Sequence, residues 1–308
     1  MEMASHRKNF GNFIRALRLP FITASILPFI AGSSLGSSDF HLIVFLLGLI
    51  AVISAHLAAN LINDYADSLS GVDWLDKKAY TYFGGSKLIQ EDIFREAFYL
   101  VSSIRFYAVS FVAVVIISAI LRDVVVIGFY LIVLLLSFFY SHKPIQFCYH
   151  RLGEAVVFLL FGPALVMGGH YLQTGIFPDS KSIIVSLPFG LLTTSILFAN
   201  EIPDYGEDSK AGKKNWVSFL GVRRSYILYG VLVLAAFAGI AVNLSYGYFG
   251  LISIISFLSL IPAAIAMIIL QRHYASKYKL MTSSKLAIAA HGLASAIIVT
   301  DLICKKFL

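Results

Sequence analysis

Charged side chains are scarce in this chain. Lys, Arg, Asp and Glu together make up 13% of the 308 residues, whereas 58% of the residues are hydrophobic. Because soluble domains carry about 25% charged residues, this composition excludes a soluble globular protein. The mean hydropathy of +0.82 predicts a chain that crosses a membrane several times.

Cysteine is almost absent as well. Cys148 and Cys304 lie far apart in the sequence, which excludes a disulfide framework and a cysteine-rich metal centre. The histidines show no metal-ligand spacing with one another, and the sequence has neither a Walker loop nor a Gly-x-Gly-x-x-Gly turn. The chemistry of this protein is therefore expected to depend on its few Asp, Asn, Lys and Tyr residues.

Nine long apolar runs are present, and runs of about 17 to 25 residues are long enough to span a bilayer as helices. They lie near residues 19–37, 41–62, 99–121, 124–140, 154–172, 182–202, 226–244, 248–270 and 285–304. The first run follows basic residues as a signal peptide does, but its length, its prolines and the runs that follow favour an uncleaved first helix. We predict an all-α polytopic membrane protein of about nine transmembrane helices, with residues 1–308 forming one domain.

Basic residues are distributed unequally between the two ends of these runs. All but five of the 24 Lys and Arg residues lie in the segment 1–18 or in the loops after the second, fourth, sixth and eighth runs. The positive-inside rule makes this side cytoplasmic, including the loops at about 63–98 and 201–225. Topology and anionic lipid then account for the net charge of +7 without a nucleic-acid partner. We expect a multi-pass protein of the cell's inner (plasma) membrane with its site facing the cytoplasm.

Two polar stretches end the second and sixth runs, and both read Asn-x3-Asp-Tyr with a further Asp three or four residues on. The first motif contains Asn60, Asp64 and Asp67, and the second contains Asn200, Asp204 and Asp208. This spacing predicts that the members of each motif share one face of a helix. Pro203 is expected to bend or end the sixth helix within the second motif.

Carboxylates at a membrane face are costly unless a compensating charge is present. Two facing sets of oxygen ligands suit Mg²⁺, which binds few carboxylates and bridges to phosphate oxygens. We therefore predict that Mg²⁺ and, through it, a diphosphate are held by Asp64, Asp67, Asp204 and Asp208, with Asn60 and Asn200 as supporting ligands. The alternative is that these residues cap helices, which is a common role of Asn and Asp.

Further candidates for contact with a diphosphate flank the two motifs. Lys87 follows a Gly-Gly-Ser sequence, whose glycines let the backbone approach a ligand closely. Asp73 stands in a Gly-x-Asp context after the first motif, and Lys213 follows the second motif. The alternatives are an ordinary flexible turn for the glycines and a lipid headgroup contact for Lys213.

The loop after the fourth run carries Tyr140 and Lys143, three residues apart. This spacing predicts that both side chains point into the mouth of the site, where Lys143 neutralises diphosphate. The alternative is an aromatic residue at the membrane interface next to a lysine that follows the positive-inside rule.

Together these motifs resemble a known family. Paired Asp-rich motifs on the second and sixth of nine spans are similar to those of the UbiA superfamily of intramembrane aromatic prenyltransferases, and the similarity covers essentially the whole chain. The MenA branch, which prenylates 1,4-dihydroxy-2-naphthoate with loss of CO₂ in menaquinone biosynthesis, is the most similar. The elements that carry this resemblance are Asn63-Asp64-Tyr65-x-Asp67, Gly71-x-Asp73, Gly84-Gly85-Ser86-Lys87, Tyr140-Ser141-x-x-Pro144 and Gly153-Glu154.

The resemblance implies nine helices around a central cavity, Mg²⁺ on the two motifs, a polyprenyl diphosphate donor and a small aromatic acceptor, within membrane lipid. Lys87 and Lys143 would then stabilise the leaving diphosphate, and Tyr140 would face the allylic cation or the acceptor. Alternative acceptors are 4-hydroxybenzoate, a glycerol phosphate lipid or a chlorin. Outside this class, a cation-coupled transporter is the rival, although transporter sites tend to lie near the bilayer midplane.

Overall fold

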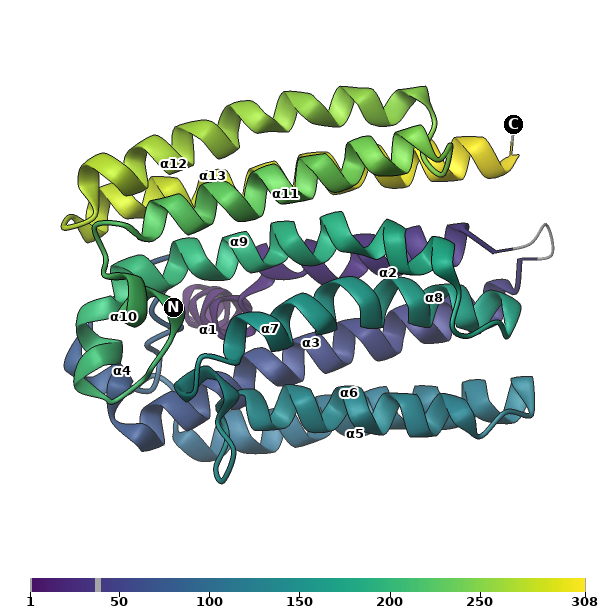
Figure 1. Cartoon of the computed structure of the whole chain (residues 1–308). Coiled ribbons are helices and arrows are strands. Elements are labelled where there is room, and N and C mark those ends of the chain that lie inside the picture. Colours follow the sequence, from purple (N-terminus) through teal and green to yellow (C-terminus); the bar gives the residue numbers. More distant parts are fainter. Residues whose placement is uncertain (1, 37–39, 308) are drawn as a thin grey trace.

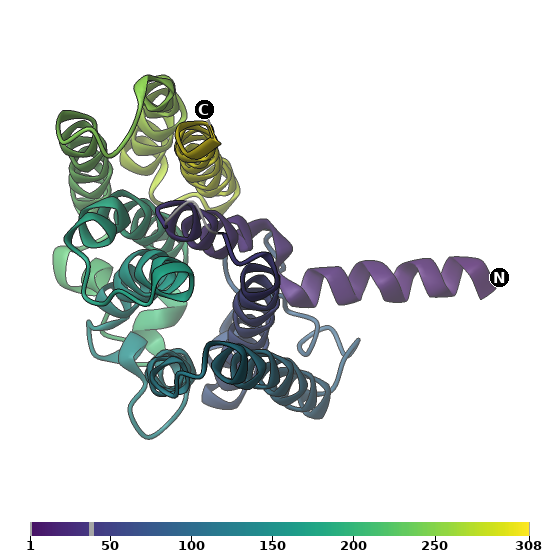
Figure 2. The ribbon, with the colours of Figure 1, turned by 90° about the vertical axis from the view of Figure 1, so that its right-hand side faces the viewer.

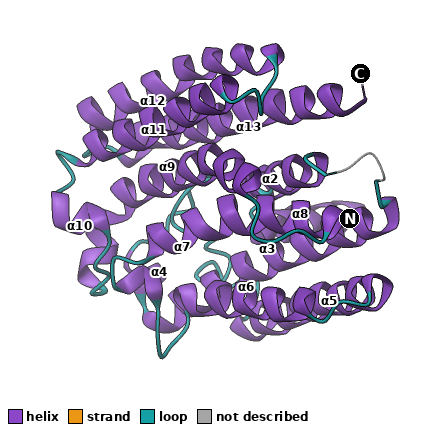
Figure 3. Cartoon of the chain, turned by 45° about the vertical axis from the view of Figure 1, so that its right-hand side comes forward, coloured by secondary structure: helices purple, strands orange, loops and turns teal. Residues whose placement is uncertain are grey.

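The computed structural model describes residues 2–36 and 40–307 (Figure 1). Residues 1, 37–39 and 308 lie outside the described ranges, and residue 37 is the last residue of the first predicted run. Within these ranges the chain is built of helices and loops, with no strand (Figure 3). The α-helices are α1 (Glu2–Leu17), α2 (Thr23–Ser34), α3 (Leu42–Ser70), α4 (Val72–Leu75), α5 (Glu96–Leu121), α6 (Val125–Ser141), α7 (Gly153–Leu159), α8 (Leu165–Thr174), α9 (Ser180–Lys210), α10 (Trp216–Leu220), α11 (Ser225–Ser245), α12 (Leu260–His273) and α13 (Lys277–Phe307). The shorter turns are η1 (Leu19–Phe21), η2 (Phe147–Tyr149), η3 (Leu160–Ala164) and η4 (Leu251–Ser259).

The described helices follow the predicted spans in order, and their number is close to the predicted nine. Seven are long and apolar enough to cross a membrane, or up to eight if the pair Phe10–Leu17 and Leu19–Ser34, bent by 42°, counts as one span. α6 is a shorter apolar helix of 17 residues between two spans. The protein is therefore an integral, multi-pass membrane protein, as its composition predicted.

The spanning helices run side by side (Figure 1). α11, α12 and α13 form one side of the molecule, α3, α5 and α6 form the other, and α2, α8 and α9 lie between them. Seen from the end of the bundle, α1 projects sideways, away from the other helices (Figure 2). α1 is thus an appendage that leads the chain into the bundle at Arg18.

Small residues let the central helices approach closely. α2 packs on α8, and a Cβ placed on Gly32 would lie 2.0 Å from the carbonyl oxygen of Val166, so only glycine fits there. Close backbone approach through small residues is a common way for helices to pack in membranes. Large apolar side chains such as Ile43, Ile104 and Leu234 remain exposed on the outer helices, as expected for surfaces that face lipid.

The two motif-bearing helices extend further than the predicted spans. α3 continues to Ser70 and α9 continues through Pro203 to Lys210, so both motifs lie on helices, as their spacing predicted, and Pro203 does not end α9. Proline within a membrane helix is tolerated where neighbouring elements hold the helix in place. Because α9 packs against α2, α7, α8, α11 and α13, its neighbours stabilise it beyond Pro203.

Candidate active site

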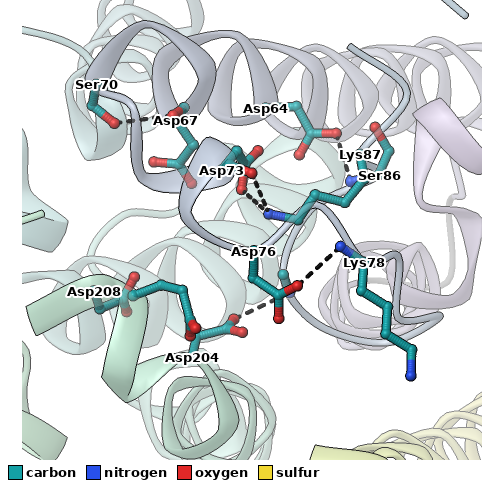
Figure 4. A network of polar contacts seen from close by, with 12 residues as sticks. Asp64, Asp67, Ser70, Asp73, Asp76, Lys78, Ser86, Lys87, Asp204 and Asp208 are labelled. Carbon is teal, nitrogen blue, oxygen red and sulfur yellow. Dashed lines mark hydrogen bonds and ion pairs between the residues drawn. The ribbon is translucent and has the colours of Figure 1, made fainter. Parts of the chain in front are cut away.

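A polar cavity of about 130 Å³ lies where α3, α4 and α9 end together, beside the loop that joins α4 to α5. Its charged lining residues are Arg18, Asp67, Asp73, Asp76, Lys78, Lys87, Glu201, Asp204, Glu207, Asp208, Lys213 and Lys277. Figure 4 shows acidic residues of the two motifs on opposite sides of this space. The fold therefore brings the two motifs close together, as the sequence predicted.

The Gly-Gly-Ser-Lys loop closes over the carboxylates through its backbone. The N–H of Gly84 donates to Asp204 Oδ2 at 3.1 Å, and the N–H of Ser86 donates to Asp64 Oδ2 at 3.0 Å (Figure 4). Gly84 and Gly85 both have φ near +74°, in the region that favours glycine. A Cβ on Gly85 would lie 3.0 Å from Asp73 Oδ2, so glycine is required here both for its conformation and for the space.

Lys87 lies inside the site as predicted. It is 4% exposed, and its ammonium donates to Asp73 Oδ1 at 2.7 Å. Burial raises the pKa of the Asp73 carboxyl to about 7, helped by the charge of Asp67 and opposed by Lys87. A buried lysine with one carboxylate partner is placed to exchange that partner for a more highly charged anion.

Lys213 joins the two motifs directly. Its ammonium lies 3.1 Å from Asp67 Oδ1 on α3 and 3.3 Å from Asp208 Oδ1 on α9. Burial acts to lower the pKa of Lys213, but the carboxylates of Asp208 and Asp67 outweigh it and hold that pKa well above its usual value. The adjoining backbone is fixed because the N–H of Lys214 donates to the carbonyl of Tyr149 at 3.2 Å.

Lys277, at the start of α13, completes the ring of cations and was not predicted. It contacts Asp76 Oδ2 at 2.7 Å and Glu207 Oε2 at 2.8 Å. Burial acts to raise the pKa of Asp76, but its hydrogen bonds with Lys277 and Lys78 bring that pKa below its usual value. Since Asp76 and Lys277 are 201 positions apart, no local sequence pattern indicated this pair.

A second, apolar cavity of about 310 Å³ continues from the polar one into the bundle, between α2, α3, α6, α8 and α9. The two cavities share five lining residues, which we call the boundary residues: Arg18, Asn63, Tyr140, Leu197 and Asn200. Below them the wall consists mostly of apolar side chains such as Phe29, Val52 and Leu165. A volume of this size falls in the range typical of small-molecule sites.

Most predicted site residues lie where the motifs placed them. Those that line the polar cavity are Asp67, Asp73, Lys87, Asp204, Asp208 and Lys213, together with the boundary residues Tyr140 and Asn200. Asp64 is 2% exposed and lies behind the loop, held by Ser86 and by Arg18 at 3.5 Å.

Besides Asp64, two predicted site residues do not line the polar cavity. Lys143 is exposed and lines neither cavity, whereas the ammonium of Lys213 lies between Asp67 and Asp208. Asn60 lines the apolar cavity and donates to the carbonyl of Leu17 at 3.0 Å, so it joins helices and lies apart from the carboxylates. The structure thus does not bring Lys143 or Asn60 to the carboxylates, and their expected roles on the diphosphate and on the metal stay predictions.

Sequence reasoning also missed Arg18, Asn63 and Asn215. Arg18 donates to Asn63 Oδ1 at 3.2 Å, and Asn215 donates to Asp208 Oδ2 at 3.2 Å. A signal was present for Asn63, which directly precedes the first Asp of its motif. The sequence carried no such signal for Arg18, because Arg18 and the basic residues near it are all explained by the positive-inside rule.

Within the part of the chain that the structure describes, no three His, Cys, Asp or Glu residues converge closely enough to hold a metal by themselves. The carboxylates instead face a shared space across lysines. This arrangement suits Mg²⁺, which takes one or two carboxylates and completes its octahedron with water and substrate phosphates. The donor set is all oxygen and therefore fits this ion.

Comparison with known proteins defines the class. A sequence profile described as the UbiA prenyltransferase family matches residues 97–290, and the chain belongs to that family of prenyl-transferring enzymes. It is similar to UbiA prenyltransferase domain-containing protein 1 of Rattus norvegicus, with 31% identity over 244 residues that cover 74% of this chain and 67% of the relative. The same-named protein of Gallus gallus is 30% identical over 238 residues, again 74% and 67% of the two chains.

Solved structures share the fold. A UbiA homologue from Aeropyrum pernix K1 superposes with a TM-score of 0.71 at 18% identity, covering 92% of this chain and 98% of that one. A UbiA homologue from Archaeoglobus fulgidus, solved with DMAPP and Mg²⁺, gives 0.63 at 19% identity, covering 93% and 99%. The predicted superfamily is thus confirmed, whereas the relatives do not single out the MenA branch, which stays a prediction.

Proposed function

We propose that this protein uses Mg²⁺ to transfer a prenyl group from a prenyl diphosphate to an aromatic acceptor, with 1,4-dihydroxy-2-naphthoate as the acceptor to test first. The observation that carries the proposal is the junction of a charged cavity with an apolar one at the boundary residues. A prenyl diphosphate has the same division, with a charged head and a hydrocarbon tail. The Archaeoglobus homologue was solved with DMAPP or with GPP, each together with Mg²⁺.

The polar cavity holds the diphosphate in this proposal. Asp67, Asp204 and Asp208 face the space where Mg²⁺ would be shared with phosphate oxygens, and Asp64 supports the loop beside it. When bound, Mg²⁺ neutralises charge that develops on the departing diphosphate. Lys87 and Lys213 would then exchange their carboxylate partners for phosphate oxygens and stabilise the same charge.

The chemistry takes place at the boundary residues. The allylic carbon–oxygen bond breaks, and its electron pair leaves with the diphosphate. An electron-rich ring carbon of the acceptor forms the new carbon–carbon bond and then loses a proton or CO₂. Tyr140 stands at this level and can face the cationic carbon with its ring, while the apolar cavity below keeps water away from it.

The test is prenyl transfer by the purified protein in nanodiscs. The protein is incubated with geranylgeranyl diphosphate, 1,4-dihydroxy-2-naphthoate and either Mg²⁺ or EDTA, and products are identified by mass spectrometry. We expect a prenylated product that has lost CO₂. This product should not form in the presence of EDTA or with the Asp204→Asn variant. Prenylation of 4-hydroxybenzoate or of a glycerol phosphate instead would change the acceptor and keep the mechanism, and the absence of product with every acceptor would refute the proposal.

A further inference from the structure

The wall of the apolar cavity contains a histidine that the proposed chemistry does not use. His56 lies on α3, is 7% exposed and lines this cavity among apolar neighbours. Its Nε2 is buried and has no hydrogen-bond partner. Buried polar groups are nearly always paired, so an unpaired ring nitrogen in an apolar wall points to a bound group that pairs with it.

The imidazole is held in a fixed orientation. Its Nδ1 forms a 2.6 Å hydrogen bond with the hydroxyl of Ser25 on α2. On another side, Phe161 packs edge-to-face, with its ring 5.8 Å from the imidazole and at 89° to it. Because Ser25 occupies Nδ1, Nε2 is the nitrogen that remains available to a ligand.

Phe161 itself stands on an unusual element. It belongs to η3 (Leu160–Ala164), a π-helical turn between α7 and α8 that contains Pro163. π-Helical turns are rare in proteins, and those that occur are often found at functional sites. Leu160, Phe161 and Ala164 of this turn all line the apolar cavity, which is an observation independent of His56.

The depth of His56 identifies what can reach it. His56 precedes the boundary residue Asn63 by seven positions on one helix, which corresponds to roughly 10 Å along the helix axis. The reacting carbon of the acceptor must lie at the boundary, beside the allylic carbon. A fused two-ring acceptor that extends from the boundary into the apolar cavity covers much of this distance.

We propose that His56 Nε2 binds a hydroxyl or carbonyl oxygen of the aromatic acceptor, with Ser25 as the residue that positions the imidazole. This inference rests on the proposed prenyl transfer and adds the acceptor site to it. The imidazole nitrogen and the acceptor oxygen then form a hydrogen bond with each other inside an otherwise apolar wall.

The test measures acceptor binding separately from turnover. The dissociation constant of 1,4-dihydroxy-2-naphthoate is obtained from its fluorescence under anaerobic conditions, with protein in nanodiscs and without donor. We expect His56→Leu to weaken binding about tenfold, as for loss of one hydrogen bond in a buried site. His56→Gln, which keeps a polar atom near the Nε2 position, should remain within about threefold of the unmodified protein, on the same reasoning.

A matched control is available in the chain. His291 on α13 is fully buried, neither of its ring nitrogens has a hydrogen-bond partner, and it lines neither cavity. His291→Leu should therefore leave acceptor binding unchanged, and thermal unfolding of each variant checks that it is folded. The Michaelis constant for the donor should change less in His56→Leu than acceptor binding does, because the diphosphate contacts lie in the polar cavity.

Several outcomes would overturn the inference. They are unchanged acceptor binding in His56→Leu, equal weakening in His291→Leu, equal weakening of acceptor and donor, and no acceptor binding by the unmodified protein. Acceptor binding that depends on His56 without any prenyl transfer would support the acceptor site while refuting the proposed reaction. The two proposals therefore fail in different ways.

Discussion

Lys213→Met is the substitution for which the structure makes the sharpest prediction, because two effects of opposite sign are expected. The ammonium of Lys213 lies between Asp67 and Asp208, 3.1 and 3.3 Å from their oxygens, with its side chain only 12% exposed. Methionine fills similar space without the charge. The two carboxylates would then face each other across the polar cavity with no cation between them.

The first effect is a loss of stability in the absence of Mg²⁺. Removing one partner of a buried ion pair costs about 3 to 5 kcal/mol, because the other charge stays buried without compensation. Mg²⁺ should restore much of this loss, since it can take the place of the ammonium between two carboxylates. Addition of Mg²⁺ should therefore raise the unfolding temperature of Lys213→Met more than that of the unmodified protein.

The second effect concerns catalysis. The departing diphosphate loses a preorganised cation, and removal of one such group typically lowers kcat about 10²- to 10³-fold. The variant should thus bind free Mg²⁺ better and transfer prenyl groups worse. A purely structural role for Lys213 would move both properties in the same direction.

The assay is thermal unfolding by intrinsic fluorescence in nanodiscs across a Mg²⁺ titration, with prenyl transfer measured on the same preparations. Lys214→Met is the matched control, because Lys214 is the adjacent lysine and its side chain is exposed. The reasoning would be refuted by a Lys213→Met protein that is as stable as this control in EDTA, or by equal stabilisation of both variants by Mg²⁺.

Three further predictions test individual features of the site. Lys143→Ala should change kcat/KM by no more than about twofold, as for an ordinary surface substitution; a loss like that of Lys213→Met would restore its predicted role on the diphosphate. Lys277→Met should raise the donor KM about tenfold, because charge-assisted contacts that hold the cavity wall are lost; an unchanged donor KM in steady-state assays would contradict this. Gly85→Ala should reduce turnover at least about tenfold, since left-handed backbone strain of about 1 to 2 kcal/mol adds to the contact with Asp73. Gly247→Ala has the same strain at a residue with open space around it and should remain active; equal losses in the two variants would argue against that contact.

The sequence was sufficient for the spans and for the carboxylates. Apolar run length predicts a membrane helix directly, and because both motifs end even-numbered spans, Asp64, Asp67, Asp204 and Asp208 were expected at the same end of the bundle. Lys213 was found because it follows its motif closely in sequence. Each of these predictions depends on residues that lie close together in the sequence, so it does not require knowledge of how distant segments pack.

Contacts between distant segments were not predictable in this way. Lys277 reaches Asp76 only because α13 returns to the motif end of the bundle. Lys143 and Lys213 both follow even-numbered spans, yet only Lys213 lies among the carboxylates in the fold. Pro203 was misjudged because propensity treats a helix as isolated, whereas α9 is held by its neighbours.

The narrow overlap of the two cavities divides the protein into parts that can change independently. Among the residues that the structure describes, only the five boundary residues belong to both walls. With the acceptor bound in the apolar cavity as proposed, we expect substitutions deeper in this wall to alter which ring is accepted and to leave the diphosphate contacts unaltered. One ionisation centre can thus serve a succession of acceptors, which makes the apolar wall the place to diversify or engineer the product.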